Sequence, residues 1–194
     1  MLAKTVADTH YHDLSALVMA LGEVLKQQVA EVDAKIIQVD EANITGNAED
    51  AAIAAAGINC VLAGAQHEKA VHLCFGNYGG QTIQKGTYNR LVEFLNALEA
   101  DHVVLELARR PESELAMLHD VKKSLGLGIG VIDIKDNEVE TPETVAKRIA
   151  RVADEVGADR IQYVHPDCGF WMLPRTVADA KMRALVAGRD LFTG

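Results

Sequence analysis

Apolar and polar positions alternate along this chain in two patterns that follow one another from end to end. Apolar side chains recur at helical spacing over residues 14–32, whereas residues 35–40 form a short run rich in β-branched side chains. The same change of pattern recurs through the remaining sequence. Further helices are predicted over 47–56, 88–100, 112–125, 141–156 and 176–187, and further strands over 70–75, 102–108, 126–134 and 160–164.

The order of these elements, one helix followed by five strand–helix units, predicts an α/β fold in a single domain over 1–194. Nearly continuous apolar strands between amphipathic helices indicate a parallel sheet with the helices outside it. Two architectures fit: a doubly wound open sheet, or part of a (β/α)8 TIM-type barrel. A complete barrel usually needs about 250 residues, so about three N-terminal units would be missing. The five C-terminal units would then be a fragment, or would be completed by a partner chain.

Charge and composition exclude several classes of protein. The net charge of −9 and the pI of about 5.2 argue against binding nucleic acid or an anionic membrane surface. No apolar run approaches the ~20 residues of a membrane span, and residues 1–13 lack the pattern of a signal peptide. Three cysteines do not suggest a disulfide framework. We therefore expect a cytoplasmic protein whose thiols stay reduced.

Polar side chains stand at the C-terminal end of each predicted strand, where α/β folds of both kinds gather functional groups. In chain order they are Asp40 and Glu41, His72 and Cys74, Glu106, Asp133, and Asp167 and Cys168. Because the ends of parallel strands meet at one edge of a sheet, we expect these acids, thiols and imidazole to converge.

A zinc site is the main chemical prediction. His72 and Cys74 are two apart on a strand, so both side chains point the same way. Glu106 lies among apolar strand residues, where a carboxylate is costly unless it is paired or binds a metal. Cys168 lies in a turn that leaves the last strand. Thiolate, imidazole and carboxylate are typical zinc ligands, and such a mixed set is typical of a catalytic site that activates a thiol for alkyl transfer.

Other interpretations of the same residues stay open. A His-x-Cys pair on a strand is also typical of a core thiol beside a hydrogen-bonded histidine. Asp40 and Glu41 could be solvated acids at a strand end, and Cys60 is expected to be a buried core thiol. The glycine-rich segment 76–86 is expected to be a loop without the spacing of a phosphate-binding loop. The other histidines without a partner pattern are expected at the surface or at caps: His10, His12, His67, His102 and His119.

Taken together, these segments resemble the C-terminal catalytic barrel of the cobalamin-independent methionine synthase family. The resemblance runs from residue 14 to about residue 190, in the family's order. The matching stretches are 36–41, 72–74, Leu105-Glu106 with Arg109, 130–134 and 166–169. The His-x-Cys and Pro-Asp-Cys-Gly elements are specific in combination.

The resemblance implies that zinc binds to His72, Cys74, Glu106 and Cys168. It implies that zinc-dependent transfer moves a methyl group from 5-methyltetrahydrofolate, or a related donor, to homocysteine, which becomes methionine. The same barrel also serves other thiol alkylations, including transfer of epoxyalkanes to coenzyme M. A truncated zinc-binding chain that needs a partner chain or a second copy is a further alternative.

The resemblance also assigns roles outside the metal. Asp40, with Glu41 beside it, falls on the acid that binds homocysteine, and Asp133 lines the active site. Lys135 stands where the full-length synthase has a histidine. If that histidine protonates the departing folate nitrogen, Lys135 or another group would do so here. The chain also departs from the family at Ala42, where proline is frequent, and at His165, where asparagine commonly precedes Pro-Asp-Cys-Gly.

Overall fold

A parallel sheet forms the centre of the computed structural model, which describes residues 2–77 and 81–194. Its strands are β1 (Ile36–Glu41), β2 (Glu68–Leu73), β3 (His102–Leu105), β4 (Gly126–Ile132) and β5 (Ile161–Pro166). They lie side by side in chain order, and every neighbouring pair is parallel. A doubly wound sheet reverses its strand order at a switch point, whereas successive strands of a (β/α) barrel are neighbours. The predicted α/β fold, five units of a partial barrel, is confirmed.

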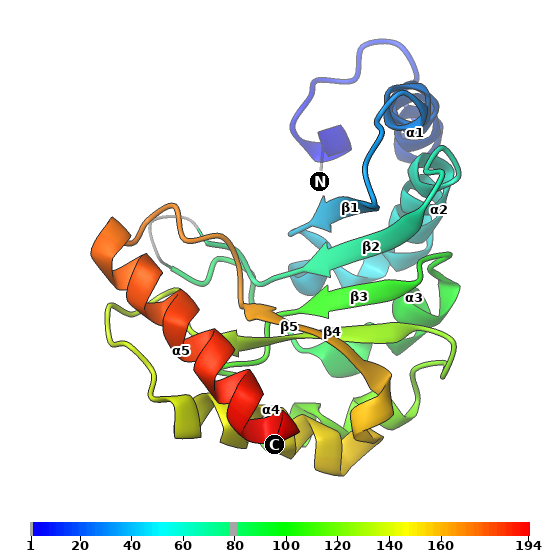
Figure 1. Cartoon of the computed structure of the whole chain (residues 1–194). Coiled ribbons are helices and arrows are strands. Elements are labelled where there is room, and N and C mark those ends of the chain that lie inside the picture. Colours follow the sequence, from blue (N-terminus) through cyan, green and yellow to red (C-terminus); the bar gives the residue numbers. More distant parts are fainter. Residues whose placement is uncertain (1, 78–80) are drawn as a thin grey trace.

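Helices cover the outer side of this sheet (Figure 1). In the described part of the chain the α-helices are α1 (Leu14–Ala30), α2 (Ala51–Leu62), α3 (Val92–Ala97), α4 (Pro142–Val156) and α5 (Arg175–Thr193). Helix α1 packs on α2, and α4 packs on α5. The start of α4 follows from its sequence, because the Thr141 side chain accepts the Thr144 N–H and Pro142 occupies the first helical turn. None of the described helices is both long and apolar enough to cross a membrane.

The predicted helix over 112–125 is wrong. Two short 3-10 helices, Glu112–Glu114 and Ala116–His119, take its place. The Asn96 side chain accepts the Lys122 N–H at 2.7 Å and donates to the Asp120 carbonyl at 2.9 Å, so backbone groups that a helix would pair are satisfied from α3.

The lengths of other elements also differ from the sequence prediction. The helix predicted over 88–100 contains a 3-10 turn, Tyr88–Arg90, followed by the short α3, and the helix predicted over 47–56 begins later and extends to Leu62. The loop predicted over 76–86 is confirmed where it is described, but residues 78–80 lie outside the described residues.

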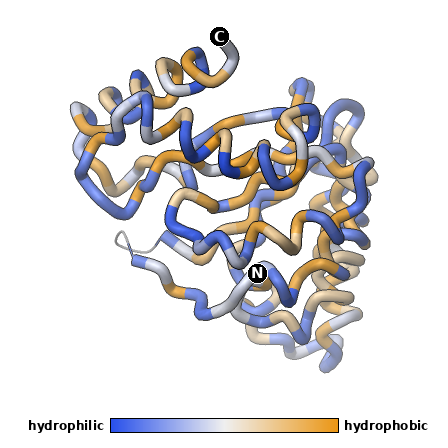
Figure 2. Tube along the Cα trace, turned by 90° about the horizontal axis from the view of Figure 1, so that it is seen from below, coloured by the Kyte–Doolittle hydropathy of each residue, from blue (hydrophilic) through white to orange (hydrophobic). Residues whose placement is uncertain are grey.

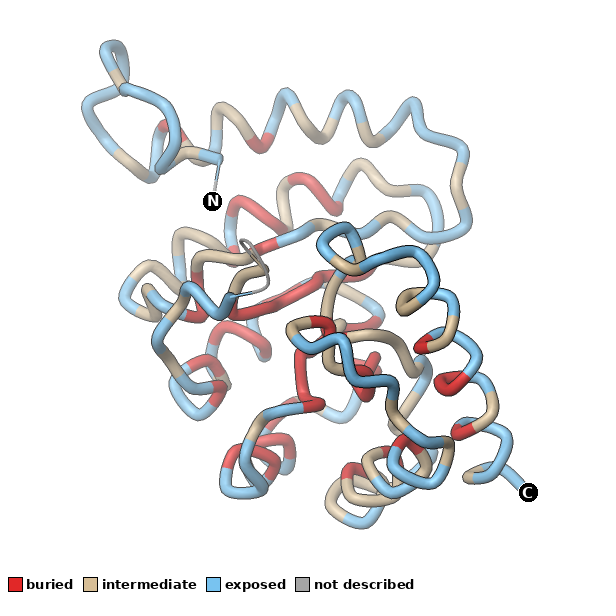
Figure 3. The backbone as a smooth tube through the Cα atoms, turned by 90° about the vertical axis from the view of Figure 1, so that its left-hand side faces the viewer, coloured by how far each residue is buried: buried red, intermediate tan, exposed pale blue. Residues whose placement is uncertain are grey.

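Residues of the strands and of the helices that cover them form the hydrophobic core. Hydrophobic and hydrophilic positions alternate along the backbone trace (Figure 2). Strand side chains on this outer face are almost wholly buried, for example those of Leu73, Leu105 and Ile129. Buried residues concentrate on the central strands, whereas most of α1 is exposed or half-buried (Figure 3). On β1 the alternate residues Ile36, Gln38 and Asp40 are exposed on the opposite, inner face of the sheet.

The inner face of β4 carries glycine at alternate positions, and side chains from β5 fill the space above it. A Cβ atom at Gly126 would overlap the Gln162 side chain, and one at Gly130 would overlap the Asp167 carboxylate. Glycine is therefore required here by close approach rather than by a turn. Because these glycines have no side chains, the polar side chains of β5 and of Asp167, which follows it, extend over β4 toward β3 and β2.

At the N-terminal ends of the strands, this reach produces a polar contact across the inner face. The Tyr163 hydroxyl contacts both carboxylate oxygens of Glu68, at 2.9 and 3.0 Å. His102 is only 3% exposed, and its Nδ1 lies 3.0 Å from Glu68 Oε1, so its predicted place at the surface is wrong.

Cys60 is half-buried and donates to Glu23 at 3.2 Å, so the prediction of a buried core thiol is wrong as well.

Candidate metal centre

Three of the four predicted metal ligands meet at the C-terminal ends of the strands. His72 is the second-last residue of β2, Cys74 directly follows β2, and Cys168 follows β5 by two residues. One ligand atom from each lies within 4.8 Å of the other two. His72 and Cys74 are buried and Cys168 is half-buried. The alternation along β2 and the parallel arrangement of β2 and β5 therefore produce the cluster that the sequence predicted.

Asp167 fixes the position of Cys168. Its backbone N–H donates to the Ile132 carbonyl at 2.9 Å, which extends the pairing of β5 with β4. Its Oδ1 accepts the N–H groups of Leu107 and Ala108, each at 3.0 Å, and Gly130 leaves room for that carboxylate. These bonds also explain why β3 ends at Leu105 instead of running to 108 as predicted.

The protonation of the cluster favours metal binding. Hydrogen bonding from Cys74, and then the proximity of His72, lowers the pKa of the Cys168 thiol to about 4. The same hydrogen bond to Cys168, together with burial, raises the pKa of Cys74. Burial alone would lower the pKa of His72, but the Cys168 sulfur and then the Asp40 and Glu106 carboxylates raise it. These contacts favour the thiolate form of Cys168, and thiolate is the form of cysteine that binds metals.

The donor set fits a zinc ion. Both imidazole nitrogens of His72 are buried, and neither has a well-aligned hydrogen-bond partner among residues 2–77 and 81–194. A buried polar atom without a partner is costly, and a metal ligand bond would satisfy it. Two sulfurs and one imidazole form a soft ligand set typical of zinc, with one tetrahedral position left over.

Glu106, the predicted fourth ligand, is buried next to this cluster but has other partners. Its Oε1 forms an ion pair with the Lys135 ammonium, and its Oε2 accepts the Phe75 N–H at 3.1 Å. The exposed fractions of the two side chains are 4% for Lys135 and 3% for Glu106. Ligation by Glu106 stays a prediction.

Tyr88 holds the backbone of Glu106 in place. The fully buried Tyr88 hydroxyl accepts the Glu106 N–H at 3.0 Å and donates to the Leu73 carbonyl at 3.2 Å. It therefore joins the C-terminal ends of β2 and β3, which carry His72 and Glu106. Tyr88 was not predicted as a site residue, because a tyrosine outside a motif gives no signal of such a contact.

The loop that follows β4 carries the two predicted catalytic residues, Asp133 and Lys135. Asp133 Oδ1 accepts the Lys135 N–H at 2.8 Å, and Asp133 Oδ2 lies 3.5 Å from the Arg109 guanidinium. The carboxylate of Glu140 accepts the Asp133 N–H at 2.7 Å. These contacts fix the loop that brings the Lys135 side chain to Glu106.

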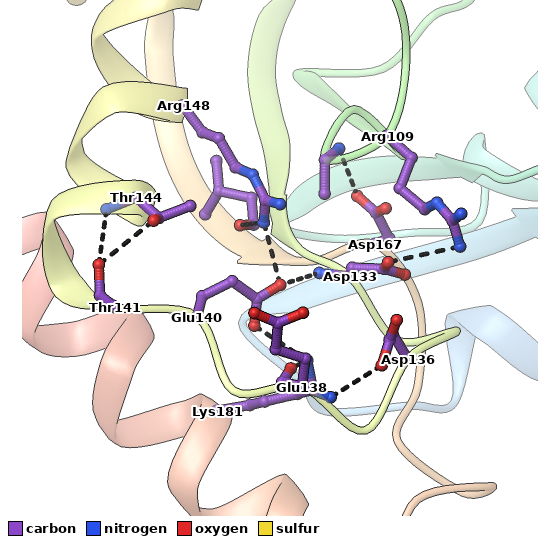
Figure 4. A network of polar contacts seen from close by, with 12 residues as sticks. Arg109, Asp133, Asp136, Glu138, Glu140, Thr141, Thr144, Arg148, Asp167 and Lys181 are labelled. Carbon is purple, nitrogen blue, oxygen red and sulfur yellow. Dashed lines mark hydrogen bonds and ion pairs between the residues drawn. The ribbon is translucent and has the colours of Figure 1, made fainter.

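Glu140 is the centre of the polar network around this loop (Figure 4). Its Oε1 also accepts from Arg148 of α4 at 3.0 Å, and its Oε2 accepts from Lys181 of α5 at 2.9 Å. Burial alone would raise the pKa of Glu140, but the hydrogen bonds from Lys181, the Asp133 backbone and Arg148 lower it. Glu140 precedes α4 in a polar stretch, and its sequence did not predict this role.

The two predicted substrate-binding acids on β1 differ in environment. Asp40 pairs with His72 in the strand register, is exposed on the inner face, and accepts a hydrogen bond from Gln38 at 2.8 Å. Glu41 is buried, and its Oε1 accepts the N–H groups of Asn43 and Ile44 at 2.6 and 3.0 Å. Asp40 thus faces the metal cluster, whereas Glu41 stabilises the turn after β1.

These features define a class: an α/β barrel-type protein with a candidate metal site of two cysteines and a histidine at the carboxyl ends of its strands. Residues 5–189 match the family described as "Cobalamin-independent synthase, Catalytic domain". The chain belongs to this family.

Its relatives carry two different names. The methionine synthase of Thermococcus kodakarensis is 27% identical over 193 residues, which cover 98% of this chain and 54% of the relative. The 2-hydroxypropyl-CoM lyase of Xanthobacter autotrophicus is 32% identical over 222 residues, which cover 98% of this chain and 58% of the relative. The chain thus spans little more than half the length of these relatives.

A solved structure has the same fold. It is the B12-independent methionine synthase of Shewanella sp. W3-18-1 in complex with selenomethionine, with a TM-score of 0.84 and 24% sequence identity. The match covers 97% of this chain and 58% of that chain.

Proposed function

We propose that this chain is the zinc-binding part of an S-methyltransferase that transfers a methyl group to the thiol of homocysteine, giving methionine. The observation that carries the proposal is the cluster of His72, Cys74 and Cys168, whose ligand atoms lie within 4.8 Å of one another. Both nitrogens of its imidazole are buried and lack a well-aligned hydrogen-bond partner in the described residues. Membership of the cobalamin-independent synthase family and the methionine synthase relatives support it.

Different residues of the chain have different proposed roles in this reaction. Bound zinc would lower the pKa of the substrate thiol, so that the nucleophilic thiolate forms at neutral pH. Methyl transfer then forms a sulfur–carbon bond and breaks the nitrogen–carbon bond of a methylated folate, whose nitrogen takes up a proton. Asp40 is exposed on the face that carries His72, so its carboxylate is suited to bind the ammonium group of homocysteine. Substrate binding by Glu41 and catalytic roles for Asp133 and Lys135 remain predictions.

A second candidate is a different thiol alkylation at the same metal site. The relative named 2-hydroxypropyl-CoM lyase is 32% identical to this chain, and Lys135 replaces the histidine expected for a folate-dependent synthase. In that case the acceptor would be coenzyme M and the carbon donor an epoxyalkane.

The proposal includes a partner. The matched relatives are almost twice as long as this chain, and β1 and β5 are the edges of its sheet. Exposed strand edges are normally covered in proteins. We propose that a partner chain or a second copy completes the barrel, in a cytoplasmic setting that keeps Cys74 and Cys168 reduced.

Metal analysis of the purified chain tests the site directly. We expect one zinc per chain, lost in the Cys74→Ser and Cys168→Ser variants and retained in Cys60→Ser, a matched control because Cys60 lies outside the cluster. Zinc that is absent from the wild type, or that is retained in both cluster variants, would refute the proposal.

A panel of acceptors and donors then separates the two candidates. Methyl transfer from methyltetrahydrofolate to homocysteine supports the first candidate. Activity with coenzyme M and an epoxyalkane alone excludes the first and supports the second. The assay is run on the chain alone and on its complex with any partner that copurifies, because the proposed barrel needs its missing strands.

A further inference from the structure

Asp167 carries a buried carboxylate oxygen that the structure leaves without a hydrogen-bond donor. Its Oδ1 accepts two backbone N–H groups, each at 3.0 Å, and so positions Cys168. Its Oδ2 is buried and lacks a well-aligned partner in the described residues. The residue as a whole is 1% exposed. A buried polar atom without a partner is costly, so a cation that could reach Oδ2 would stabilise it.

Lys135 supplies a buried cation in the same region. The Asp167 N–H donates to the Ile132 carbonyl at 2.9 Å, three residues before Lys135, and Asp167 Oδ1 accepts the N–H of Leu107, the residue after Glu106. Asp167 is thus bonded both to the strand end that carries Glu106 and to the start of the loop that carries Lys135. Burial raises the pKa of Asp167, and the charge of Lys135 lowers it, so the ammonium and this carboxylate are within electrostatic range.

We propose that Lys135 binds two carboxylates in turn: it pairs with Glu106, as in this structure, and it passes to Asp167 Oδ2 when Glu106 binds the metal. Lys135 is thereby a positioning residue that lets the Glu106 carboxylate leave its counter-ion and regain it. The inference rests on the proposed metal site, and it gives Lys135 a role other than proton donation.

The first argument is that both arrangements leave the buried charges of Lys135 and Glu106 with a partner. In the first, the two side chains neutralise each other, at exposed fractions of 4% and 3%. In the second, Glu106 binds the metal and the ammonium binds Asp167 Oδ2. Removing one partner of a buried ion pair without replacing it is strongly unfavourable, and Asp167 provides the replacement. An approaching ammonium also favours the ionised form of a carboxylate.

The second argument is that only the end of the Lys135 side chain has to move. The Lys135 N–H donates to Asp133 at 2.8 Å, so the start of the side chain is fixed. A lysine has a flexible four-carbon stem and three donors, which can turn from one acceptor to another. The second acceptor is already in place, because Oδ1 of Asp167 is bound by the end of β3 and the carboxylate lies over Gly130.

The third argument is the position of Glu106 beside the cluster. Its Oε2 accepts the N–H of Phe75, the residue after Cys74, at 3.1 Å. Its carboxylate lies within electrostatic range of His72 and Cys74. The position of the Lys135 ammonium therefore determines whether Glu106 is free to join these ligands. A substrate thiol that displaced Glu106 would return it to Lys135, so ligand exchange would leave no buried carboxylate unpaired.

Crystal structures of the wild type, one with zinc and one after chelation, test the exchange directly. In the zinc-bound protein we expect Glu106 on the metal and Lys135 Nζ within about 2.7–2.9 Å of Asp167 Oδ2. After chelation Lys135 should pair with Glu106 again. Lys135 that stays on Glu106 in both structures, or that turns away from both acids with zinc bound, overturns the inference.

Zinc affinity, measured by competition with a chromophoric chelator, gives a second test in a mutant cycle. Asp167→Asn keeps the oxygen that accepts the two backbone N–H groups, but it removes the charge that would hold Lys135. It should weaken zinc binding about tenfold, as expected for an outer partner of a ligand. In the Lys135→Met background the same change should alter the affinity less than about threefold. Equal effects in both backgrounds would overturn the inference, because Asp167 would then act through Cys168 alone.

Asp136→Asn is the matched control, since Asp136 is an exposed acid in the loop that carries Lys135. It should change the zinc affinity less than about threefold. An effect as large as that of Asp167→Asn would show that any acid near this loop supports metal binding, and would also overturn the inference. Circular dichroism verifies the fold of each variant, and the two wild-type crystal structures carry the test if a variant does not fold.

The outcomes also separate this inference from the proposed function. A wild type that binds no zinc refutes the proposed metal site and the inference with it. Zinc binding without an exchange of partners by Lys135 refutes only the inference. An exchange of partners without any methyl transfer refutes only the reaction.

Discussion

Glu140→Gln is a substitution away from the metal centre for which the structure predicts a large effect on stability. Glutamine has the shape of glutamate and keeps an oxygen that can accept the Asp133 N–H, but it lacks the charge that pairs with Lys181. The Lys181 side chain is 0% exposed and that of Glu140 is 7% exposed. Loss of one partner from a buried pair typically costs about 3–5 kcal/mol. We therefore expect the free energy of unfolding to fall by about that amount.

Urea unfolding followed by circular dichroism at pH 7, on metal-free protein, measures this difference. The matched control is Glu138→Gln, because Glu138 is an exposed acid in the same loop, and a surface substitution should stay within about 0.5 kcal/mol. The double variant Glu140→Gln/Lys181→Met should be more stable than Glu140→Gln alone, since it leaves no unpaired ammonium.

The pH dependence gives a second check on the same reasoning. The hydrogen bonds from Lys181, the Asp133 backbone and Arg148 outweigh burial and hold the pKa of Glu140 below its ordinary 4.5. A carboxylate with a lowered folded pKa stabilises the protein above its unfolded pKa and loses that contribution as pH falls through the folded value. The wild type and Glu140→Gln should therefore converge in stability below about pH 4.5. A difference under about 1 kcal/mol at pH 7, or one that persists unchanged in acid, would refute the argument.

Two further substitutions test the supports of the metal centre. Gly130→Ala should lower stability by about 1–3 kcal/mol and reduce zinc content, because the new Cβ would overlap the Asp167 carboxylate. Gly169→Ala is its control, since nothing lies within 4 Å of a Cβ there, and equal effects of the two alanines would contradict the steric account. Tyr88→Phe should cost about 1–3 kcal/mol in thermal or urea unfolding, because two buried backbone groups lose their hydroxyl partner. A loss of less than about 0.5 kcal/mol would show that the hydroxyl is dispensable.

The alternation of apolar strands and amphipathic helices was sufficient to predict the parallel sheet, because such strands must be covered on the outside by helices. The same periodicity gave a wrong prediction, an α-helix, for residues 112–125. Leu115, Leu118 and Val121 are buried in the core as a helical face would be, yet they lie in 3-10 turns and bends. Periodicity shows which side chains are buried, but it does not determine the backbone conformation. Here hydrogen bonds from Asn96, which lies more than twenty residues earlier in the chain, stabilise the non-helical backbone.

The candidate site shows the same division between local and distant information. His72, Cys74 and Cys168 could be predicted because histidine and cysteine are typical metal ligands, and here they stand at strand ends. The parallel order of the strands brings these ends together. The pairing of Glu106 with Lys135 could not be predicted, because the 29-residue separation carries no periodic signal. It depends on how the loop after β4 folds back over β3.

The contact between Tyr163 and Glu68 has a consequence for a chain that has not yet acquired its metal. It links β5 to β2 at one end of the barrel interior, and the ligands from the same two strands meet at the other end. The curved sheet therefore has two links between β2 and β5, and the Tyr163–Glu68 hydrogen bond is the one that does not need a metal. We expect the sheet of the apoprotein to keep its curvature before zinc binds, so that zinc binding requires no refolding. Metal supply would then control activity after synthesis, independently of whether the chain has folded.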